Sequence, residues 1–229
     1  MEALDSLKWD AAGLVTVVVQ DRLSGEVRMV AHANRDALRA TLATGYAHFY
    51  SRSRGALWKK GETSGHVIAV QEVWADCDGD ALVYLALAQG PSCHTERVTC
   101  FFRRVTPDGV VDDATQHARG VLPSLAAELE ARRTASGSTS YTKRLLEGGA
   151  PAINAKITEE AAGHAAAIAS EESPRVVSEA ADVLFHVMVG LLHRGVDLTD
   201  VERELLRRTG VSGLVEKASR KGTQGGSAA

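Results

Sequence analysis

At residues 75–80 the chain reads Ala-Asp-Cys-Asp-Gly-Asp, which places Asp76, Asp78 and Asp80 around a single thiol, Cys77. Aspartate is a hard oxygen ligand and thiolate is a soft one, so interleaving them suggests two different metals bound side by side. If the segment is a strand, alternate side chains point to opposite faces. The three aspartates would then share one face that suits Mg²⁺, and Cys77 would point to the other.

The remaining cysteines of the chain, Cys93 and Cys100, would meet Cys77 on that second face. Three thiolates leave the fourth tetrahedral position of Zn²⁺ open for water, which is typical of catalytic rather than structural zinc. The alternative is that the cysteines are small buried hydrophobic residues and that residues 78–80 form the turn of a hairpin. Spacing alone does not decide between these interpretations.

The composition limits the class of protein. The chain has 229 residues, enough for one large or two small domains, and 45% of them are hydrophobic, enough for a core. A net charge of −3 argues against a general binder of nucleic acid or anionic membranes. The odd number of cysteines, the mixed acidic N-terminus and the absence of a long apolar run favour a soluble cytoplasmic protein.

Residues 1–113 are predicted to form a β-rich domain. A β-branched run at 14–19 and the segment 27–31 flank a turn, which predicts a hairpin. Asn34 is the expected N-cap of a helix that Gly45 ends. Further strands are expected at 48–51, 67–74 and 81–87, and residues 101–105 are expected to close the sheet.

A polar, cationic and glycine-punctuated run separates the strands expected at 48–51 and 67–74. Arginine forks, a lysine pair, hydroxyls and exposed backbone N–H groups are what an anionic phosphate needs. The alternative is a solvated loop with ordinary surface charges, but the density of such groups favours ligand binding. The predicted substrate-binding residues are His48, Ser51, Arg52, Ser53, Arg54, Trp58, Lys60, Thr63 and Ser64.

Several segments of this half, in order, resemble the phosphoribosyl-AMP cyclohydrolase family, which opens an adenine ring in histidine biosynthesis. The resemblance covers roughly residues 10–105 and rests on SRSR at 51–54, LWKKG at 57–61, SGH at 64–66, DCDGDAL at 76–82, GPSCHT at 90–95 and TCF at 99–101. It implies Mg²⁺ at Asp76, Asp78 and Asp80, and Zn²⁺ at Cys77, Cys93 and Cys100. It also implies a homodimer whose zinc sites take cysteines from both chains.

The expected chemistry follows from these groups. Zn²⁺ lowers the pKa of a bound water to about 7, which gives hydroxide at neutral pH. Attack on C6 of the electron-poor ring and collapse of the adduct would break the N1–C6 bond. His94, next to a zinc cysteine, is the first candidate for moving the proton, and His48 and His66 are weaker ones. The basic loop would hold the two phosphates, with Mg²⁺ as a further clamp.

Past a linker predicted at residues 114–120, the composition changes to Ala, Leu, Glu and Arg with helical spacing. Residues 121–210 are predicted to form a small four-helix unit that needs a partner copy to bury its apolar faces, and 211–229 a flexible tail. The expected features are a helix through Leu122, Leu125 and Leu129, a Gly-Gly-Ala-Pro turn, a helix over 153–170, a helix from an N-cap at Ser173 to Gly195 at its C′ position, and a capping box at 199–202.

Acidic residues lie on two of these helices. Glu179, Asp182 and His186 share one helical face, and the preceding helix offers Glu159 and Glu160. Carboxylates on facing helices are how bundles build Mg²⁺ sites. The alternative is a set of surface acids on amphipathic helices.

This half resembles phosphoribosyl-ATP pyrophosphohydrolases, all-α enzymes of the MazG-like group, over about residues 121–208. The matching segments are SYTKRLL at 140–146, Lys156 with Glu159-Glu160, and EAADVLFH at 179–186. The resemblance implies Mg²⁺ at Glu159, Glu160, Glu179 and Asp182, the last three also catalytic, with water directed at the α–β bridge of a triphosphate. The family usually carries a third glutamate where this chain has Gly163, which predicts weaker Mg²⁺ binding.

The sequence as a whole predicts an α+β protein of two domains: a β-rich metal-binding domain and an all-α MazG-like domain. It is expected to be a fused bifunctional hydrolase that converts phosphoribosyl-ATP to phosphoribosyl-AMP and then opens the ring. Fusion would raise the local concentration of the shared intermediate. One alternative keeps the cyclohydrolase and makes the helical half an inactive dimerisation module, because of Gly163. Another is a zinc-stabilised nucleic-acid or nucleotide-binding module, against which the net acidity argues.

Overall fold

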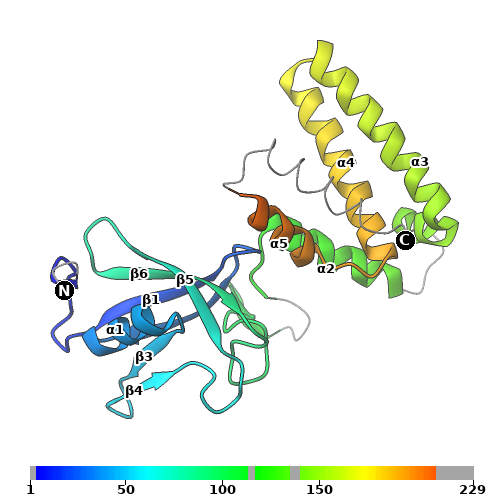
Figure 1. Cartoon of the computed structure of the whole chain (residues 1–229). Helices are drawn as coiled ribbons and strands as arrows, with labels where there is room; N and C mark the ends of the chain where they lie inside the picture. Colours follow the sequence, from blue (N-terminus) through cyan, green and yellow to red (C-terminus); the bar gives the residue numbers. More distant parts are fainter. Residues whose placement is uncertain (1–3, 113–116, 135–139, 210–229) are drawn as a thin grey trace, which may run out of the picture. The chain divides into compact units, whose positions relative to one another are not determined.

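The computed structural model describes residues 4–112, 117–134 and 140–209 (Figure 1). The predicted tail at 211–229 and part of the predicted linker lie outside this range. The chain divides into two compact units, Met1–Gly120 and Val121–Ala229. The first unit is rich in sheet and the second is helical.

The first unit is built on a four-stranded sheet in the order β2-β1-β6-β5. β1 (Val15–Asp21) pairs antiparallel with β2 (Val27–Ala33) and parallel with β6 (Ala81–Ala88). β6 in turn pairs antiparallel with β5 (Ile68–Ala75). The predicted hairpin of the first two strands is confirmed.

One face of this sheet is covered by helix α1 (Arg35–Thr44). The Asn34 side chain accepts a hydrogen bond from the Ala37 backbone N–H at 2.9 Å, and Gly45 ends the helix at φ 71°, so both predicted caps are confirmed. Leu38 of this helix packs in one core with the alternating β1 valines and with Phe49. This burial fixes the sheet register, since a one-residue slip would turn the valines to solvent.

Two small hairpins complete the unit: β3 (His48–Ser51) with β4 (Ala56–Lys59), and β7 (Arg103–Thr106) with β8 (Gly109–Asp112). The prediction that residues 101–105 close the main sheet is wrong, because among the strands that the structure describes β7 pairs with β8 and not with the main sheet. The turn at Pro107-Asp108 supplies a local partner strand, and closing so short a loop costs little entropy.

Residues 76–80 form the turn of the β5–β6 hairpin, so the prediction of a strand there is wrong. The carboxylate of Asp76 accepts hydrogen bonds from the backbone N–H groups of Gly79 at 2.8 Å and Ala81 at 3.2 Å. Gly79 adopts φ 80°, which glycine allows at little cost. The hairpin-turn alternative therefore describes this backbone correctly.

The second unit contains α2 (Val121–Thr134), α3 (Tyr141–Ser170), α4 (Ser173–His193) and α5 (Leu198–Arg208). A two-residue connection joins α3 to α4, and these helices pack side by side (Figure 1). The predicted Gly-Gly-Ala-Pro turn is a kink inside α3, where Gly149 has φ 63° and ψ −164°. The core of the unit consists of Leu129, Leu145, Ile153, Met188 and Val189.

Two predicted helix starts are displaced. The N-cap of α4 is Glu172 rather than Ser173, although Gly195 follows the helix with φ 63° as expected. The capping box at 199–202 is wrong, because Asp197 caps α5 by accepting from the Thr199 N–H at 2.8 Å. An aspartate two residues earlier satisfies the first free N–H groups, so the helix begins there.

By length and composition alone, α4 is long and apolar enough to cross a membrane, a test that the core helix of a soluble protein also passes. It also carries Glu179 and Asp182, and ionisable groups inside a membrane span are costly. Since α4 packs along α3 and contributes to the helical core, we interpret it as the central helix of this unit.

Candidate active sites

The turn between β5 and β6 gathers three carboxylates. Asp76, Asp78 and Asp80 are exposed, and each offers an oxygen within 4.8 Å of the others. Among the residues that the structure describes, no other group of three metal-ligating side chains is so close. The turn thus brings together the three aspartates that the sequence analysis had placed on one face of a strand.

Lys8 lies at this cluster, which the sequence did not predict. Its Nζ is 3.1 Å from Oδ2 of Asp78, and its backbone N–H donates to the Gly79 carbonyl oxygen at 2.7 Å. Both members of the ion pair are more than half exposed, 64% and 53%, so the pair adds little to stability. The N-terminal segment therefore places an ammonium group against the carboxylates.

The carboxylates also affect one another. The backbone N–H of Ala81 lowers the pKa of Asp76 most strongly. The negative charges of Asp78 and then Asp76 raise the pKa of Asp80 above its usual range. Crowded like charges of this kind are relieved by a cation.

The cysteines separate into a pair and a single residue. Cys93 and Cys100 lie close enough for each to alter the pKa of the other, whereas Cys77 forms no cluster of metal ligands with them in the described part of the chain. Burial and then the charge of Cys93 raise the pKa of Cys100 to about 11. Cys77 is exposed on the aspartate turn.

The buried thiol of Cys93 ionises more readily than that of Cys100, because its pKa is lowered rather than raised. Burial acts to raise its pKa, but hydrogen bonds from the Thr95 hydroxyl, at 3.1 Å, and from the Thr95 backbone N–H outweigh burial and lower it. Nδ1 of His94 lies 3.9 Å from the same sulfur. Of the weaker candidates, His66 has its Nε2 3.3 Å from a carboxylate oxygen of Glu96, and Nδ1 of His48 donates to the Tyr46 carbonyl oxygen at 2.8 Å.

Part of the predicted phosphate-binding loop is assembled at the β3–β4 turn. The Arg54 Nε donates to Oγ of Ser51 at 3.3 Å, and its guanidinium lies 6.0 Å from the ring centre of Trp58. The hydroxyl oxygens of Ser51 and Ser53 are 3.4 Å apart. Lys60 lies apart from this group, since it is buried and its charge reaches Cys100. The other predicted members, Arg52, Thr63 and Ser64, are exposed.

In the helical unit, two of the four predicted acids lie between α3 and α4. Glu179 is buried and Glu160 is half-buried, whereas Glu159 and Asp182 are exposed. Nζ of Lys156 lies 2.9 Å from a carboxylate oxygen of Glu159 and 2.8 Å from one of Glu160. The hydrogen bond from Lys156 to Glu160 is the main reason that the pKa of Glu160 is lowered. Arg175, which the sequence did not single out, pairs with Glu179 one turn along α4.

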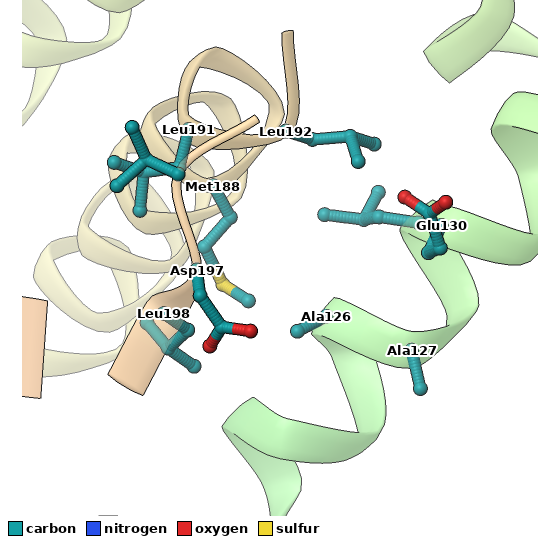
Figure 2. A pocket seen from close by; sticks show the side chains of 10 residues that line it. Ala126, Ala127, Glu130, Met188, Leu191, Leu192, Asp197 and Leu198 are labelled. Carbon is teal, nitrogen blue, oxygen red and sulfur yellow. The ribbon is translucent and has the colours of Figure 1, made fainter. Parts of the chain in front are cut away.

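A separate cavity of about 310 Å³ opens between α2 and the C-terminal end of α4 (Figure 2). Its walls are mostly apolar and include Met188, Leu191 and Leu192, with Glu130 and Asp197 as the charged residues. It contains none of the predicted site residues, and its two acids would repel a polyphosphate. We therefore do not assign catalysis to it.

Comparison with known proteins gives one match for each unit. Residues 29–102 match the family described as phosphoribosyl-AMP cyclohydrolase, and residues 122–209 match phosphoribosyl-ATP pyrophosphohydrolase. The histidine biosynthesis bifunctional protein HisIE of Wolinella succinogenes is 44% identical over 223 residues, covering 95% of this chain and 97% of the relative. HisIE of Aquifex aeolicus is 41% identical, covering 88% and 98%. The chloroplastic bifunctional protein of Arabidopsis thaliana is 40% identical, covering 95% and 80%.

Proposed function

The chain belongs to the family of histidine-biosynthesis bifunctional proteins, and on that premise we propose how its own residues serve the two reactions. It is a bifunctional hydrolase that joins a phosphoribosyl-AMP cyclohydrolase to a phosphoribosyl-ATP pyrophosphohydrolase. The proposed domains are residues 1–113 and 121–210, the second with a MazG-like fold. The observation that carries the proposal is the presence of a distinct group of acidic or thiol ligands in each unit.

We assign Mg²⁺ in the first domain to Asp76, Asp78 and Asp80. Three exposed carboxylates within 4.8 Å of one another fit a hard divalent cation, and their mutual repulsion favours one. Exposure leaves room for substrate oxygens to complete the coordination. Mg²⁺ held there would neutralise phosphate charge, and Arg54 and Ser51 of the β3–β4 turn would bind a substrate phosphate.

Zn²⁺ is assigned to Cys93 and Cys100 of one chain with Cys77 of a second copy. The pair fits a soft cation but supplies only two thiolates, and Cys77 is exposed and apart from them. When bound, zinc would supply an ionised water near neutral pH. His94, beside Cys93, is positioned to move the proton between that water and the leaving ring nitrogen.

Mixing two inactive variants tests this shared site. Cys77→Ala and Cys93→Ala should each lose ring opening, but a mixed dimer would keep one intact site, formed by Cys77 of one chain and Cys93 of the other. Random assembly should restore roughly a quarter of the wild-type rate, since about half of the dimers are mixed and each has one working site of two. No recovery, although mixed dimers are present, would place all three cysteines on one chain.

The helical domain would hold Mg²⁺ at Glu160 and Glu179, with Glu159 and Asp182 as further ligands. Lys156 and Arg175 neutralise these acids in the structure, so a divalent ion would replace cations that are already present. Mg²⁺ held by these carboxylates would neutralise charge on the triphosphate, and the carboxylates would orient the attacking water. Glu160→Gln should abolish pyrophosphate release and leave ring opening intact, whereas Glu128→Gln, on the surface of α2, should change neither.

The alternative function for this half is dimerisation without catalysis. Gly163 favours it, because the position has no carboxylate to offer. A large gain in pyrophosphate release by Gly163→Glu would support the alternative, whereas release by the wild-type chain that this substitution does not raise would remove it. A homodimer and a cytoplasmic location are part of the proposal in either case.

A further inference from the structure

Lys60, directly after β4, is the buried member of the cationic run that was predicted to bind phosphate. Only 9% of the residue is exposed. Within residues 4–112, 117–134 and 140–209, its Nζ has neither a hydrogen bond nor an ion pair. An ammonium group that is withdrawn from water is costly unless an anion lies beside it. The position of Lys60 therefore suits a negative charge that a bound group brings.

The turn that begins at Lys60 packs on the loop that carries Cys93. The chain folds back at Gly61, where φ is 82° and a Cβ would lie 2.5 Å from the carbonyl carbon of His66. The His66 side chain then reaches the other loop, with its Nε2 3.3 Å from a carboxylate oxygen of Glu96. Glu96 lies three residues after Cys93, so these contacts hold Lys60 near the thiol pair.

Electrostatics also connects Lys60 with this pair. Burial and then the charge of Cys93 raise the pKa of Cys100, and the positive charge of Lys60 acts in the opposite direction. Three thiolates around Zn²⁺ leave one excess negative charge, since each thiolate contributes one and the ion carries two positive charges. A lysine cation beside the pair would offset this excess.

We infer that Lys60 is a positioning residue of the zinc centre, whose buried ammonium offsets the negative charge that the thiolates of Cys93 and Cys100 bring to the ion. It would thus act on metal retention rather than on the substrate phosphate that was expected of it. The zinc centre rests on the proposed function, whereas the burial of Lys60 does not. Lys59, the preceding residue, differs, because its Nζ lies 4.2 Å from the ring centre of Tyr46.

Competition for zinc between the full chain and a colorimetric chelator tests the inference. Lys60→Met removes the charge but keeps most of the side-chain volume, and it should bind zinc about tenfold more weakly than the wild type. Lys60→Arg keeps the charge and should bind zinc more tightly than Lys60→Met. Lys59→Met is the matched control and should bind zinc as the wild type does. Zinc that Cys93→Ala also retains counts as bound elsewhere.

Two results of this competition would overturn the inference. Wild-type zinc affinity in Lys60→Met, with a raised KM for phosphoribosyl-AMP, would return Lys60 to phosphate binding. Equal weakening by Lys60→Met and Lys60→Arg would show that the shape of the side chain matters and its charge does not.

Thermal melting separates this role from a purely structural one. The three tryptophans of the chain, Trp9, Trp58 and Trp74, all lie in the first unit, so their fluorescence reports that unit separately. In metal-free protein, Lys60→Met removes an unpaired buried charge and should raise the fluorescence midpoint by a few degrees. Zinc should then stabilise the variant less than the wild type, because stabilisation by a ligand falls with its affinity. A metal-free midpoint that does not rise would contradict the inference.

The same measurements distinguish this inference from the proposed function. If the wild-type chain bound no zinc that depends on Cys93, the proposed zinc centre would fail and the inference with it. If zinc bound through Cys93 but Lys60→Met left its affinity unchanged, the inference alone would fail.

Discussion

The hydroxyl of Tyr141 lies 2.9 Å from Nε2 of His186, which joins the start of α3 to the middle of α4. Nδ1 of the same ring is 2.8 Å from the Asp182 carbonyl oxygen. A carbonyl only accepts, so Nδ1 carries a proton, and in the neutral ring Nε2 accepts from the tyrosine hydroxyl. Tyr141 thus fixes one orientation of a buried histidine near Glu160, whose pKa is lowered mainly by Lys156 and less by the charge that this ring carries when protonated.

Tyr141→Phe should destabilise the helical domain by about 1–3 kcal/mol, because the buried Nε2 loses its partner while the ring contact with Phe185 remains. The measurement is the midpoint of the 222 nm transition. Tyr46→Phe, in the first unit, is the matched control and should leave that transition unchanged. If both variants left the midpoint unchanged, the Tyr141 hydroxyl would contribute nothing to the stability of the helical domain.

Cys93→Ala should lower the zinc content and abolish ring opening of phosphoribosyl-AMP, since it removes the thiol with the lowered pKa. Pyrophosphate release from phosphoribosyl-ATP should persist, because that chemistry belongs to the other unit. Metal analysis and the two product assays check this. Loss of both activities in a variant that is still dimeric would argue against independent sites.

Lys8→Met should strengthen binding of Mn²⁺, used as a probe for Mg²⁺, at the aspartate turn. The ammonium group occupies the neighbourhood of Asp78 that a cation would use, and its removal leaves three uncompensated charges. We expect a gain of a few fold, because the ion pair is exposed and worth about 0–1 kcal/mol. Arg39→Met removes a surface charge paired with Asp36 and should not alter binding. Weaker binding in Lys8→Met would mean that Lys8 helps to assemble the site.

Asp80→Asn should raise the melting midpoint of the metal-free first unit at neutral pH. The pKa of Asp80 is raised because its ionised form is repelled by Asp78 and Asp76, so the destabilisation is present above that pKa. It disappears as acid protonates the group, and the variant should lose its advantage near pH 3. Tryptophan fluorescence melts at both pH values test this, with Asp108→Asn in the β7–β8 turn as control. If Asp80→Asn raised the melting midpoint equally at neutral pH and near pH 3, charge repulsion would be excluded as the cause.

Local signals in the sequence predicted local structure well. The Asn34 cap, the Gly45 stop and the β1–β2 hairpin each depend on residues a few positions apart, and each is confirmed. The grouping of Asp76, Asp78 and Asp80 was also predicted, although a turn rather than a strand produces it. The aspartate-glycine spacing that suggests a metal site is the same spacing that favours a turn.

Contacts between distant residues could not be predicted in this way. Lys8 and Asp78 are 70 residues apart, and no periodicity connects them. The same holds for Glu179 and the space over Gly163, which depend on how α3 packs on α4. The absence of a glutamate at 163 was visible in the sequence, but the position of the Glu179 carboxylate over this glycine was not.

The most direct test is to supply phosphoribosyl-ATP and phosphoribosyl-AMP separately to the purified full chain with Mg²⁺ and trace Zn²⁺. The account predicts ring-opened product from both substrates and pyrophosphate from phosphoribosyl-ATP, since Glu160 and Glu179 suffice despite Gly163. Ring-opened product from phosphoribosyl-AMP alone, with no pyrophosphate from phosphoribosyl-ATP, would contradict it and assign the helical domain to assembly.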